Sequence, residues 1–549
     1  MKTLKLSAFF AVAGSLLLSL VAVASAQVAK PNIIASIDFD PTHDGYSFRN
    51  YGGKTHDGSE DLDADDLIEL FGAENVCIEG SKADDCVLYE TADEWREKMI
   101  KMADGGHCLG FSVTAMRMFL DLPYREKTTP ADFQKGAEAP HDLKPDEDLF
   151  NLIAHFHIVQ TLREVYSFRG SGFKIGPAGV LKLLTESFRS GKEHYDLAIF
   201  NKVNGKLERG HSVLPFAIED MGGGIVRIHV YDNNFPGQTK YVTINTKTSE
   251  WRYRTASNPS DVAHDYVGNA STNSLSLNQI SDFDYEEYEC PFCEKPGGKA
   301  KTAGPRQVKV SFSGVADLLI TDPNKKQIGY DAKTKTEVNQ IGGADIIYSG
   351  GDGLEDYDYS PTYAMPYNPA AKTPYNILIS GNDVNSEEDA DLSVEGPGFV
   401  IGFSDILLDP KEQLAVSIAP DGKTLSFTAS SDGETPTIFI TTEAGPNKPS
   451  YSFEVGGVSI DGGKTLTMTV DVEHGKVFFK DNDRNEDAYD VHIERTNADG
   501  TKIKFDAKDI DQPGSDNFEV DFSKWDGSHP LCVEDDDDGD GFDDETCGS

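Results

Sequence analysis

The sequence predicts an α+β protein in which a mixed head is followed by β-sandwich domains. Residues 31 to about 290 interleave helical and strand periods, whereas residues 306–528 alternate in short strands broken by Gly, Pro, Asp and Asn. A chain of 549 residues also exceeds the roughly 250–300 residues at which one hydrophobic core stops growing. Several domains are therefore expected, and 38 % hydrophobic residues are enough to fill their cores.

The composition places the boundaries between these domains. The segment after the head is rich in Ser, Asn, Asp and Gly, which predicts a linker. The alternation in the rear half does not decide between sandwiches and barrels, although the strand spacing favours sandwiches. The expected segments are a signal peptide (1–26), a head domain (31–257), a flexible linker with a Cys-x-x-Cys motif (258–305), two β-sandwich domains (306–404 and 405–528) and an acidic tail (529–549).

The first 26 residues predict export. Two lysines precede an apolar run from Leu6 to Ala24, and Ala24-Ser25-Ala26 forms a small-residue cleavage site. An uncleaved membrane anchor is the alternative, because the run is almost long enough to span a bilayer. No later segment is apolar for long enough, so we expect a secreted, soluble protein without stable membrane insertion.

The chain is strongly acidic, with 50 basic and 93 acidic side chains and a formal net charge of −43. Such a surface repels phosphate backbones and anionic lipid, which argues against nucleic acid and against a peripheral membrane habit. Cations are the more compatible partners.

Two kinds of element are expected in the head. Acidic starts followed by apolar residues three or four apart predict helices at Asp65–Phe71 and Asp93–Ala103, and a longer one at Leu149–Phe168. An antiparallel meander follows this helical half. Its expected strands are Tyr195–Val203, Ser212–Glu219, Ile225–Tyr231 and Lys240–Asn245, with turns at Asn204-Gly205 and Gly222-Gly223-Gly224.

Seven cysteines define the expected disulfides, because cysteines outside the cell pair where geometry permits. Local separation pairs Cys77 with Cys86, Cys290 with Cys293, and Cys532 with Cys547. Cys108 is left alone. It is either a buried spare cysteine that packs as a small hydrophobe or a functional thiol.

The surroundings of Cys108 favour a functional thiol. Gly105 and Gly106 precede it, and apolar residues then recur at helical spacing. Cys108 is thus expected at a helix N-terminus, where backbone N–H groups and the helix dipole favour a thiolate. The N–H of Cys108 could face a developing oxyanion.

A thiolate nucleophile needs a base, and His211 is the best placed histidine. It stands where a turn becomes a buried strand, and the next strand ends in Asp232, Asn233 and Asn234. Antiparallel pairing brings the start of one strand beside the end of the other, so His211 and Asp232 are expected to be neighbours. Asp232 is preferred because it shares a face with the apolar residues of its strand, but Asn233 and Asn234 remain alternatives.

These residues resemble a known family. The segments Met102-Ala-Asp-Gly-Gly-His-Cys-Leu-Gly-Phe-Ser112, Gly210-His-Ser-Val213 and Val230-Tyr-Asp-Asn-Asn-Phe-Pro236 resemble papain-like cysteine hydrolases of the secreted bacterial type. The resemblance covers about residues 35–255 and implies a helical half packed on an antiparallel sheet. It also implies that Cys108 attacks an acyl carbon, His211 takes the thiol proton and Asp232 orients the imidazole. The implied substrate is a protein or peptide, with no cofactor for catalysis.

Two departures and two rival functions accompany this resemblance. No glutamine lies between Gln27 and Cys108 to serve as the second oxyanion donor, and 103 residues separate Cys108 from His211, fewer than the roughly 130–150 of papain.

A transglutaminase-like acyl transferase uses the same Cys, His, Asp order. A non-catalytic extracellular adhesion protein, whose sandwiches bind a cell-surface or matrix ligand, is the other alternative.

The acidic tail predicts a calcium site. Asp536, Asp538, Asp540 and Asp544, with Gly541 at a turn, place oxygen ligands at the alternate positions that Ca²⁺ can use. This loop resembles thrombospondin type 3 repeats, although a solvated acidic tail is the alternative. For the Cys-x-x-Cys motif, a structural disulfide is expected rather than a redox or zinc site, because no second pair lies at zinc-ribbon spacing.

Overall fold

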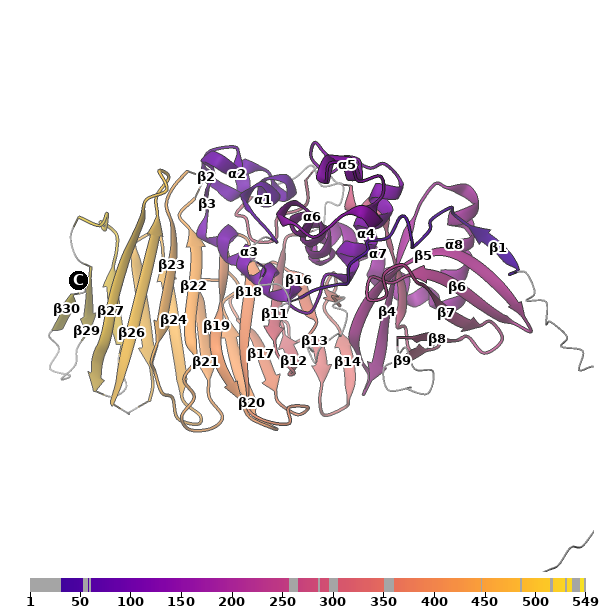
Figure 1. The fold of residues 1–549 in the computed structure, drawn as a ribbon. Coiled ribbons are helices and arrows are strands. Elements are labelled where there is room, and N and C mark those ends of the chain that lie inside the picture. The colour runs from indigo at the N-terminus through magenta and orange to yellow at the C-terminus, as the bar shows by residue number, and fades with distance from the viewer. Residues whose placement is uncertain are drawn as a thin grey trace, which may run out of the picture.

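The structure is a computed structural model, in which a helical cluster and a curled sheet are packed on a long β-sandwich (Figure 1). The residues predicted as a signal peptide lie outside the described part of the chain. The structure describes residues 31–52, 58, 61–255, 265–284, 287–295, 305–349, 360–445, 447–483, 486–513, 517–528, 531–535 and 544–547.

The helices lie in the first half of the head, as expected. They are α1 (Ala64–Phe71), α2 (Ala73–Val76), α3 (Glu90–Ala103), α4 (Cys108–Phe119), α5 (Pro130–Phe133), α6 (Glu147–Ile158), α7 (Arg163–Gly172) and α8 (Gly176–Ser190). The single helix predicted over residues 149–168 is instead α6 and α7. They are separated because the chain passes through a 3₁₀ turn, in which Thr161 Oγ1 donates to Ile158 O (2.9 Å), and becomes extended at Leu162.

An antiparallel sheet forms the second half of the head, which confirms an α+β arrangement. Its strands are β1 (Ile33–Ser36), β4 (Tyr195–Val203), β5 (Lys206–Gly222), β6 (Ile225–Tyr231), β7 (Thr239–Asn245), β8 (Glu250–Arg254), β9 (Asp265–Gly268) and β10 (Leu275–Gln279). The order is β10-β4-β5-β6-β7-β8-β9, with β1 paired to β5, and the sheet curls until β9 contacts β4. Both α4 and α8 pack against β5.

The segment predicted as a flexible linker belongs largely to the head. β9 and β10 are strands of the head sheet, and Leu275 and Leu277 are buried against β4. Phe292 is also fully buried in the core of the helical cluster. The polar composition of the segment concealed two short apolar alternations, so the head extends to about residue 295.

The rear half is a sandwich of two antiparallel sheets. The head-side sheet has the order β15 (Asp345–Ile347), β16 (Thr362–Pro366), β11 (Gln307–Ser313), β18 (Glu388–Gly396), β19 (Phe399–Leu408), β22 (Thr437–Glu443), β23 (Ser450–Gly456), β26 (Glu486–Thr496), β27 (Lys502–Pro513). The far sheet has the order β14 (Thr336–Asn339), β13 (Gln327–Asp331), β12 (Asp317–Thr321), β17 (Tyr375–Ser380), β20 (Gln413–Ile418), β21 (Thr424–Thr428), β24 (Thr465–Asp471), β25 (Lys476–Asp481), β28 (Asn517–Asp521), β29 (Cys532–Asp535), β30 (Asp544–Cys547). From β18 to β27, successive hairpins alternate between the two sheets.

One hydrophobic core runs through the sandwich, so the structure differs from the expected pair of sandwiches. The expected boundary between residues 404 and 405 falls inside β19, and one cluster of buried side chains extends from Val308 to Leu531. In β24, for example, Leu466, Met468 and Val470 point inward while the intervening threonines point outward. The repeated alternation of hairpins gives this core no break at which to divide.

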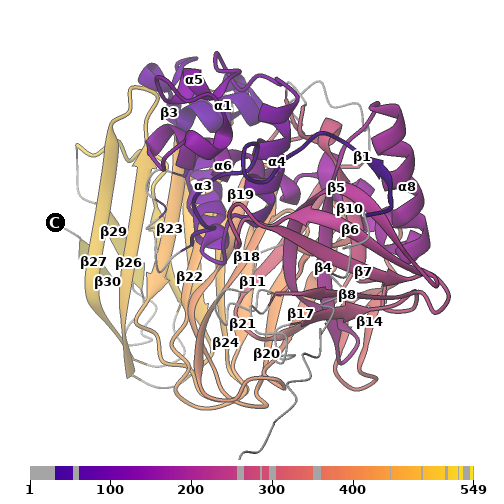
Figure 2. The ribbon, with the colours of Figure 1, turned by 45° about the vertical axis from the view of Figure 1, so that its right-hand side comes forward.

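The head and the sandwich share a packed interface (Figure 2). Helix α3 lies on β19, β22 and β23 of the head-side sheet, and Val400 of β19 joins the core of the helical cluster. Hydrogen bonds cross the interface, from Glu90 N to Ser450 Oγ (2.9 Å) and from Lys309 Nζ to Thr161 O (2.8 Å). The outer face of the sandwich therefore serves as one wall of the head.

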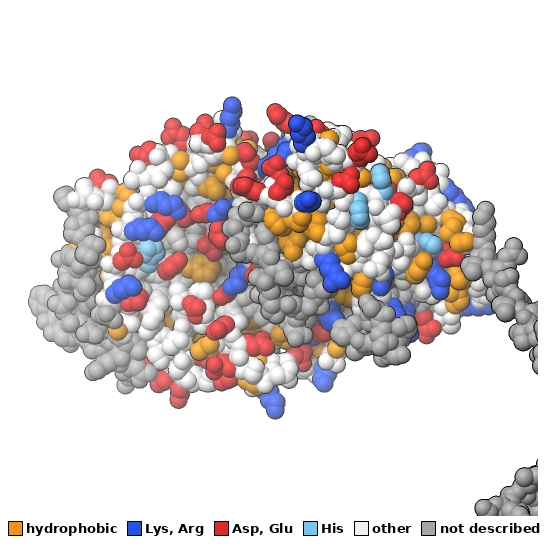
Figure 3. Space-filling view, in the orientation of Figure 1, with side chains coloured by type: hydrophobic (Ala, Val, Ile, Leu, Met, Phe, Trp, Pro, Cys, Tyr) orange, Lys and Arg blue, Asp and Glu red, His pale blue; other side chains and the backbone are white. Residues whose placement is uncertain are grey.

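Acidic side chains are spread over the visible face of the molecule, with fewer basic ones between them (Figure 3). This distribution agrees with the net charge of −43. None of the helices in the described residues has both the length and the apolar character needed to cross a bilayer.

Candidate active site

Cys108 is the first residue of α4, as the glycine-rich sequence before it predicts. Gly106 adopts φ 113°, a conformation that favours glycine, and so turns the chain into the helix. Cys108 is fully buried and forms no disulfide with another described cysteine. At the first position of the helix, the positive end of the helix dipole favours a thiolate.

The loop before Cys108 is held by the segment that precedes α1. Asn50 Oδ1 accepts the N–H of His107 (2.8 Å), and Tyr51 O lies 3.0 Å from His107 Nδ1. The other ring nitrogen of His107 lies 3.1 Å from Asp61 Oδ2. His107 is therefore a structural residue whose contacts fix the position of the neighbouring thiol.

His211 and Asp232 are neighbours, as the hairpin pairing predicts. The register pairs Leu214 with Tyr231, which places His211 near the start of β5 beside the residue that follows β6. His211 Nε2 lies 3.1 Å from Asp232 Oδ1, and both side chains are buried. Tyr253 donates its hydroxyl to the other carboxylate oxygen, so the carboxylate is held from both sides.

The structure distinguishes the three polar residues after β6. Asp232 contacts the imidazole of His211, whereas Asn233 Nδ2 donates to Cys108 O (3.1 Å). The backbone N–H of Asn234 donates to Asp232 Oδ1 (2.8 Å). The same turn thus holds the carboxylate and ties the strand end to the start of α4.

The electrostatics of this cluster favour a charged imidazole. Burial opposes the charge, but the Asp232 carboxylate and then the Cys108 sulfur raise the pKa of His211 well above its ordinary value. Burial raises the pKa of Asp232, but His211 and the hydrogen bonds from Tyr253 and Asn234 together outweigh it, so the pKa is lowered. The Nδ1 atom of His211 has no nitrogen or oxygen partner among the described residues, which leaves it available to the Cys108 sulfur.

Two further buried ionisable groups, Arg169 and Asp196, interact electrostatically, and Arg169 also interacts with Cys108. Arg169 of α7 is 2 % exposed and donates to the side-chain and backbone oxygens of Gln160, both at 3.1 Å. Burial lowers the pKa of Arg169 to about 10, while the charges of Asp196 and Cys108 oppose that change. Burial also raises the pKa of Asp196 to about 7. The guanidinium is thus a second positive group in the neighbourhood of Cys108.

Sequence reasoning missed Arg169 and Asp196. Asp196 Oδ2 accepts hydrogen bonds from Ser212 Oγ (3.1 Å) and Asn278 Nδ2 (2.8 Å). A buried carboxylate in β4 leaves no local motif, and Asn278 lies in the segment assigned to the linker. Only the strand pairing of β10, β4 and β5 brings these residues together.

The expected disulfides are confirmed where the structure describes them. Cys77–Cys86 and Cys290–Cys293 are bonded, with Cα atoms 5.3 Å and 5.6 Å apart. Cys532 is disulfide-bonded too, and the register places it opposite Cys547.

The predicted calcium loop cannot be placed in the fold. Asp536, Asp538 and Asp540 lie outside the described residues, as does the side chain of Asp544. In the described part of the chain, no group of three or more His, Cys, Asp or Glu side chains is arranged to hold a metal ion.

Comparisons with known proteins identify no relative. No protein-family model, no curated protein and no solved structure matches the chain.

Proposed function

We propose that this chain is a secreted thiol-dependent hydrolase of the papain-like type, a peptidase or amidase with Cys108 as its nucleophile. One observation carries the proposal: the buried imidazole of His211 is engaged by Asp232 on one side and influenced by the Cys108 sulfur on the other. A cysteine at a helix start, packed against an antiparallel sheet that supplies the histidine and the carboxylate, also fits the resemblance noted in the sequence.

The proposed reaction has two half-reactions. Cys108 gives its proton to His211, and the thiolate attacks the acyl carbon of an amide, forming a C–S bond as the carbonyl π bond opens. The N–H of Cys108 stabilises the developing oxyanion. His211 then protonates the leaving nitrogen as the C–N bond breaks, which leaves an acyl thioester. Water, deprotonated by His211, attacks the thioester to release the acid and restore the thiol.

The burial of the site imposes a condition on this reaction. Cys108, His211 and Asp232 expose 0 %, 1 % and 0 % of their surfaces. A substrate therefore reaches the sulfur only when neighbouring groups move. The same burial lowers the local dielectric constant, which strengthens the attraction between the thiolate and the imidazolium.

The location and accessory parts are proposed from the sequence and the disulfides. Disulfides such as Cys77–Cys86 and Cys290–Cys293 persist in oxidising compartments, which supports a protein that acts outside the cell. We assign Ca²⁺ binding to the acidic tail and a cell-surface or matrix ligand to the sandwich. A rise in melting temperature with Ca²⁺ that is lost in an Asp538→Asn, Asp540→Asn variant tests the tail.

Alkylation of Cys108 by iodoacetamide, followed by peptide mapping, tests the catalytic pair. We expect the folded wild type to react at about pH 6, because His211 and Arg169 stabilise the thiolate. The His211→Ala variant keeps Arg169 but loses the imidazolium, so its reaction should shift to higher pH, toward the pKa of about 8.5 of a free thiol. His229→Ala is the matched control, since His229 also contacts a carboxylate, Glu219, at 3.0 Å but lies away from Cys108.

Two results would contradict the proposal. If His211→Ala and wild type share one pH profile, His211 does not activate the thiol. If Cys108 is labelled only in unfolded protein, it is a spare thiol, and the non-catalytic binding protein becomes the better description.

The acyl acceptor is tested separately. Incubation of the wild type with glutamine-containing protein and a labelled amine should yield new peptide termini or ammonia without amine incorporation. Incorporation that depends on Cys108 would instead establish the transglutaminase-like alternative.

A further inference from the structure

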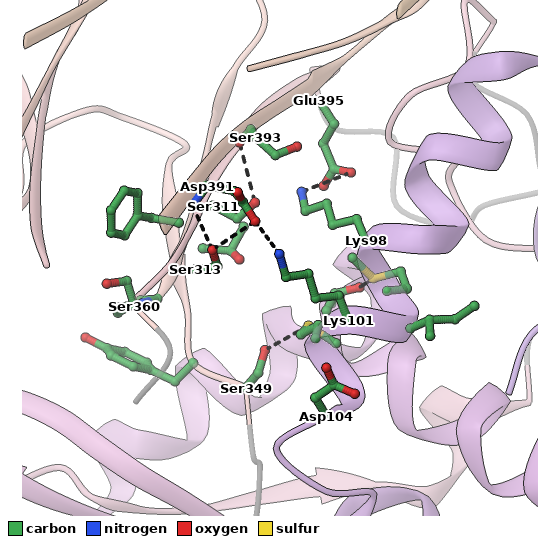
Figure 4. A pocket seen from close by; sticks show the side chains of 18 of the residues that line it. Lys98, Lys101, Asp104, Ser311, Ser313, Ser349, Ser360, Asp391, Ser393 and Glu395 are labelled. Atoms are coloured by element: carbon green, nitrogen blue, oxygen red, sulfur yellow. Dashed lines mark hydrogen bonds and ion pairs between the residues drawn. The ribbon is translucent and has the colours of Figure 1, made fainter. Parts of the chain in front are cut away.

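A cavity of about 450 Å³ lies between the head and the head-side sheet (Figure 4). Its walls come from α3, β4, the start of β5 and the outward faces of β11 and β18. Asp104, in the loop before Cys108, and Gly210, the residue before His211, both line it. The cavity therefore reaches both segments that carry the proposed catalytic pair.

Three buried polar atoms on the wall have no hydrogen-bond partner in the described part of the chain. They are Nζ of Lys98, Oγ of Ser393 and Oε2 of Glu395. Glu395 is 2 % exposed, and Lys98 Nζ lies 3.6 Å from Glu395 Oε2, close enough for attraction but too far for a hydrogen bond. Buried polar groups are normally paired, so these atoms point to a ligand that supplies the missing partners.

Other polar groups on the same wall are already engaged. Asp391 pairs with Lys101 and accepts a hydrogen bond from Ser313 Oγ (3.3 Å), and its N–H donates to the same hydroxyl (2.8 Å). The group formed by Lys98, Ser393 and Glu395 is thus the part of this wall with hydrogen bonds left to make.

The donor and acceptor character of these three atoms suits an amide. Lys98 offers N–H donors, Glu395 offers an acceptor, and the Ser393 hydroxyl can do either. Because the two charged groups already attract each other at 3.6 Å, the ligand needs no net charge. An amide presents a C=O acceptor and an N–H donor within one planar unit, so it can satisfy Lys98 and Glu395 together.

One further part of the cavity wall is aromatic. Phe200 and Tyr348 form an edge-to-face pair with ring centroids 6.0 Å apart, and Phe439 lies on the opposite sheet. Gly210 lets these walls close in, since a Cβ there would lie 2.3 Å from Phe200 Cε1 and 2.9 Å from Ser349 O. Aromatic side chains beside a few placed polar groups are typical of ligand-binding pockets.

We infer that this cavity binds a peptide segment of the substrate and that Lys98, Ser393 and Glu395 recognise one of its amide groups. The role of the segment in catalysis rests on the proposed function. Binding itself does not require Cys108 to react, so the two can be tested apart.

Binding is measured on the full chain carrying Cys108→Ala, which cannot form a thioester. The probe is a pool of N-acetylated, C-amidated hexapeptides of zero net charge, retained by the protein in equilibrium dialysis and identified by mass spectrometry. Maltohexaose is the polyhydroxyl comparison, and acidic and basic hexapeptide pools test for recognition by charge. We expect retention of neutral peptides with apolar side chains and none of maltohexaose.

Two variants test the recognition group. Ser393→Ala removes a hydroxyl that makes no hydrogen bond as donor or acceptor in the described residues, so it should fold normally and weaken binding of a retained peptide about threefold or more. Lys98→Met should weaken it about tenfold or more. Ser417→Ala in β20 of the far sheet and Lys182→Met on the exposed face of α8 are the matched controls, and neither should change the dissociation constant.

The inference is overturned if no neutral peptide is retained, if Ser393→Ala binds as tightly as its parent, or if maltohexaose or a charged pool binds instead with the same dependence on Lys98. None of these results alters the alkylation of Cys108. Conversely, normal peptide binding with an unreactive Cys108 would preserve the binding site and remove the proposed hydrolase.

Discussion

In the proposed mechanism, the charge on His211 sets the reactivity of Cys108. A buried imidazole would ordinarily be neutral, but its contact with Asp232 and the proximity of the Cys108 sulfur raise its pKa well above the usual value. Asp232 in turn receives hydrogen bonds from Tyr253 and from the backbone of Asn234, which keep it ionised and in place. The contacts around the carboxylate therefore act on the thiol through the histidine.

The Asp232→Asn variant should lower the pKa of His211 by about one to three units, because an opposite charge is lost while burial remains. The measurement is an NMR titration of ¹³C-labelled histidine, with the resonance assigned by its absence in His211→Gln. Glu219→Gln changes a histidine contact elsewhere on the sheet and should leave the His211 titration unchanged. An unaltered titration in Asp232→Asn would show that this carboxylate does not set the charge of His211.

Part of the site could be predicted from sequence. Cys108, His211 and Asp232 are each marked by a local pattern: glycines before a helix, a turn before a strand, and a polar residue ending a strand. Arg169 and Asp196 are marked by no pattern, because their significance arises from burial and from contacts across three strands and a helix. Hydrophobic periodicity indicates which face of a helix or strand a residue lies on, but it does not indicate which charged groups from distant parts of the chain lie near that residue.

At the scale of elements, the position of α4 depends on a close approach to α6. Gly110 lies in the first turn of α4, and a Cβ at this position would come within 2.0 Å of Ile153 O. The obstacle is backbone, so it cannot move aside by rotation of a side chain. The position of Cys108 therefore depends on Gly110, which has no part in the proposed reaction.

Gly110→Ala should destabilise the protein by about 2 kcal/mol, because the cost of overpacking exceeds the gain in helix propensity. The midpoint of urea unfolding, followed by the helical circular-dichroism signal, measures the change. Gly170→Ala in α7 is the matched control, since nothing lies within 4 Å of its Cβ position. It should be stabilising by about 0.5–1 kcal/mol. A Gly110→Ala protein as stable as wild type would show that α4 and α6 can separate at little cost.

The elements themselves were predictable to different degrees. The strands at Tyr195–Val203 and Ile225–Tyr231 coincide with β4 and β6, because each has apolar alternation and a glycine-containing turn. β9 and β10 were not predicted, because an alternation of only four or five residues is a weak indicator of a strand within a polar segment. The division of the sandwich at residues 404 and 405 was wrong because strand boundaries say nothing about whether neighbouring hairpins share a core.

At the scale of the whole molecule, several buried carboxyl groups have raised pKa values and so retain their protons to higher pH in the folded chain. Burial raises the pKa of Asp196, Glu443 and Glu94 to about 7, although they lie in the head sheet, in the sandwich and in α3. Their ordinary pKa values are 3.8 for Asp and 4.5 for Glu, so the folded chain holds protons that the unfolded chain releases.

Stability should therefore fall as the pH rises from about 5 to about 8. A raised folded pKa contributes stability that is present below the unfolded value and lost as the pH passes the folded value, and His211 acts in the same direction. The lowered pKa of Asp232 adds stability that is complete before this window begins. Burial lowers the pKa of His157 and of His194, which opposes the fall up to their ordinary value of 6.5, so the fall should be steepest above that pH.

Calorimetric melting at fixed high ionic strength, which screens repulsion between surface charges, checks this dependence. Thr91 Oγ1 donates to Glu443 Oε1 at 2.6 Å, and Glu443→Gln keeps an acceptor for this hydrogen bond. Because the variant lacks the titrating carboxyl group, its melting temperature should decrease less between about pH 5 and about pH 8 than that of the wild type. A melting temperature that rises from about pH 5 to about pH 8 would contradict the assignment of these protons.

The alternation of hairpins between the two sheets has a consequence for how such a chain can vary. Each hairpin pairs with the preceding hairpin of its own sheet and leaves a strand edge for the next hairpin. Adding or removing a pair of hairpins at the end of the sandwich remote from α4 would change the length of the protein without altering the surroundings of Cys108. The length of the sandwich is thus structurally independent of the site around Cys108.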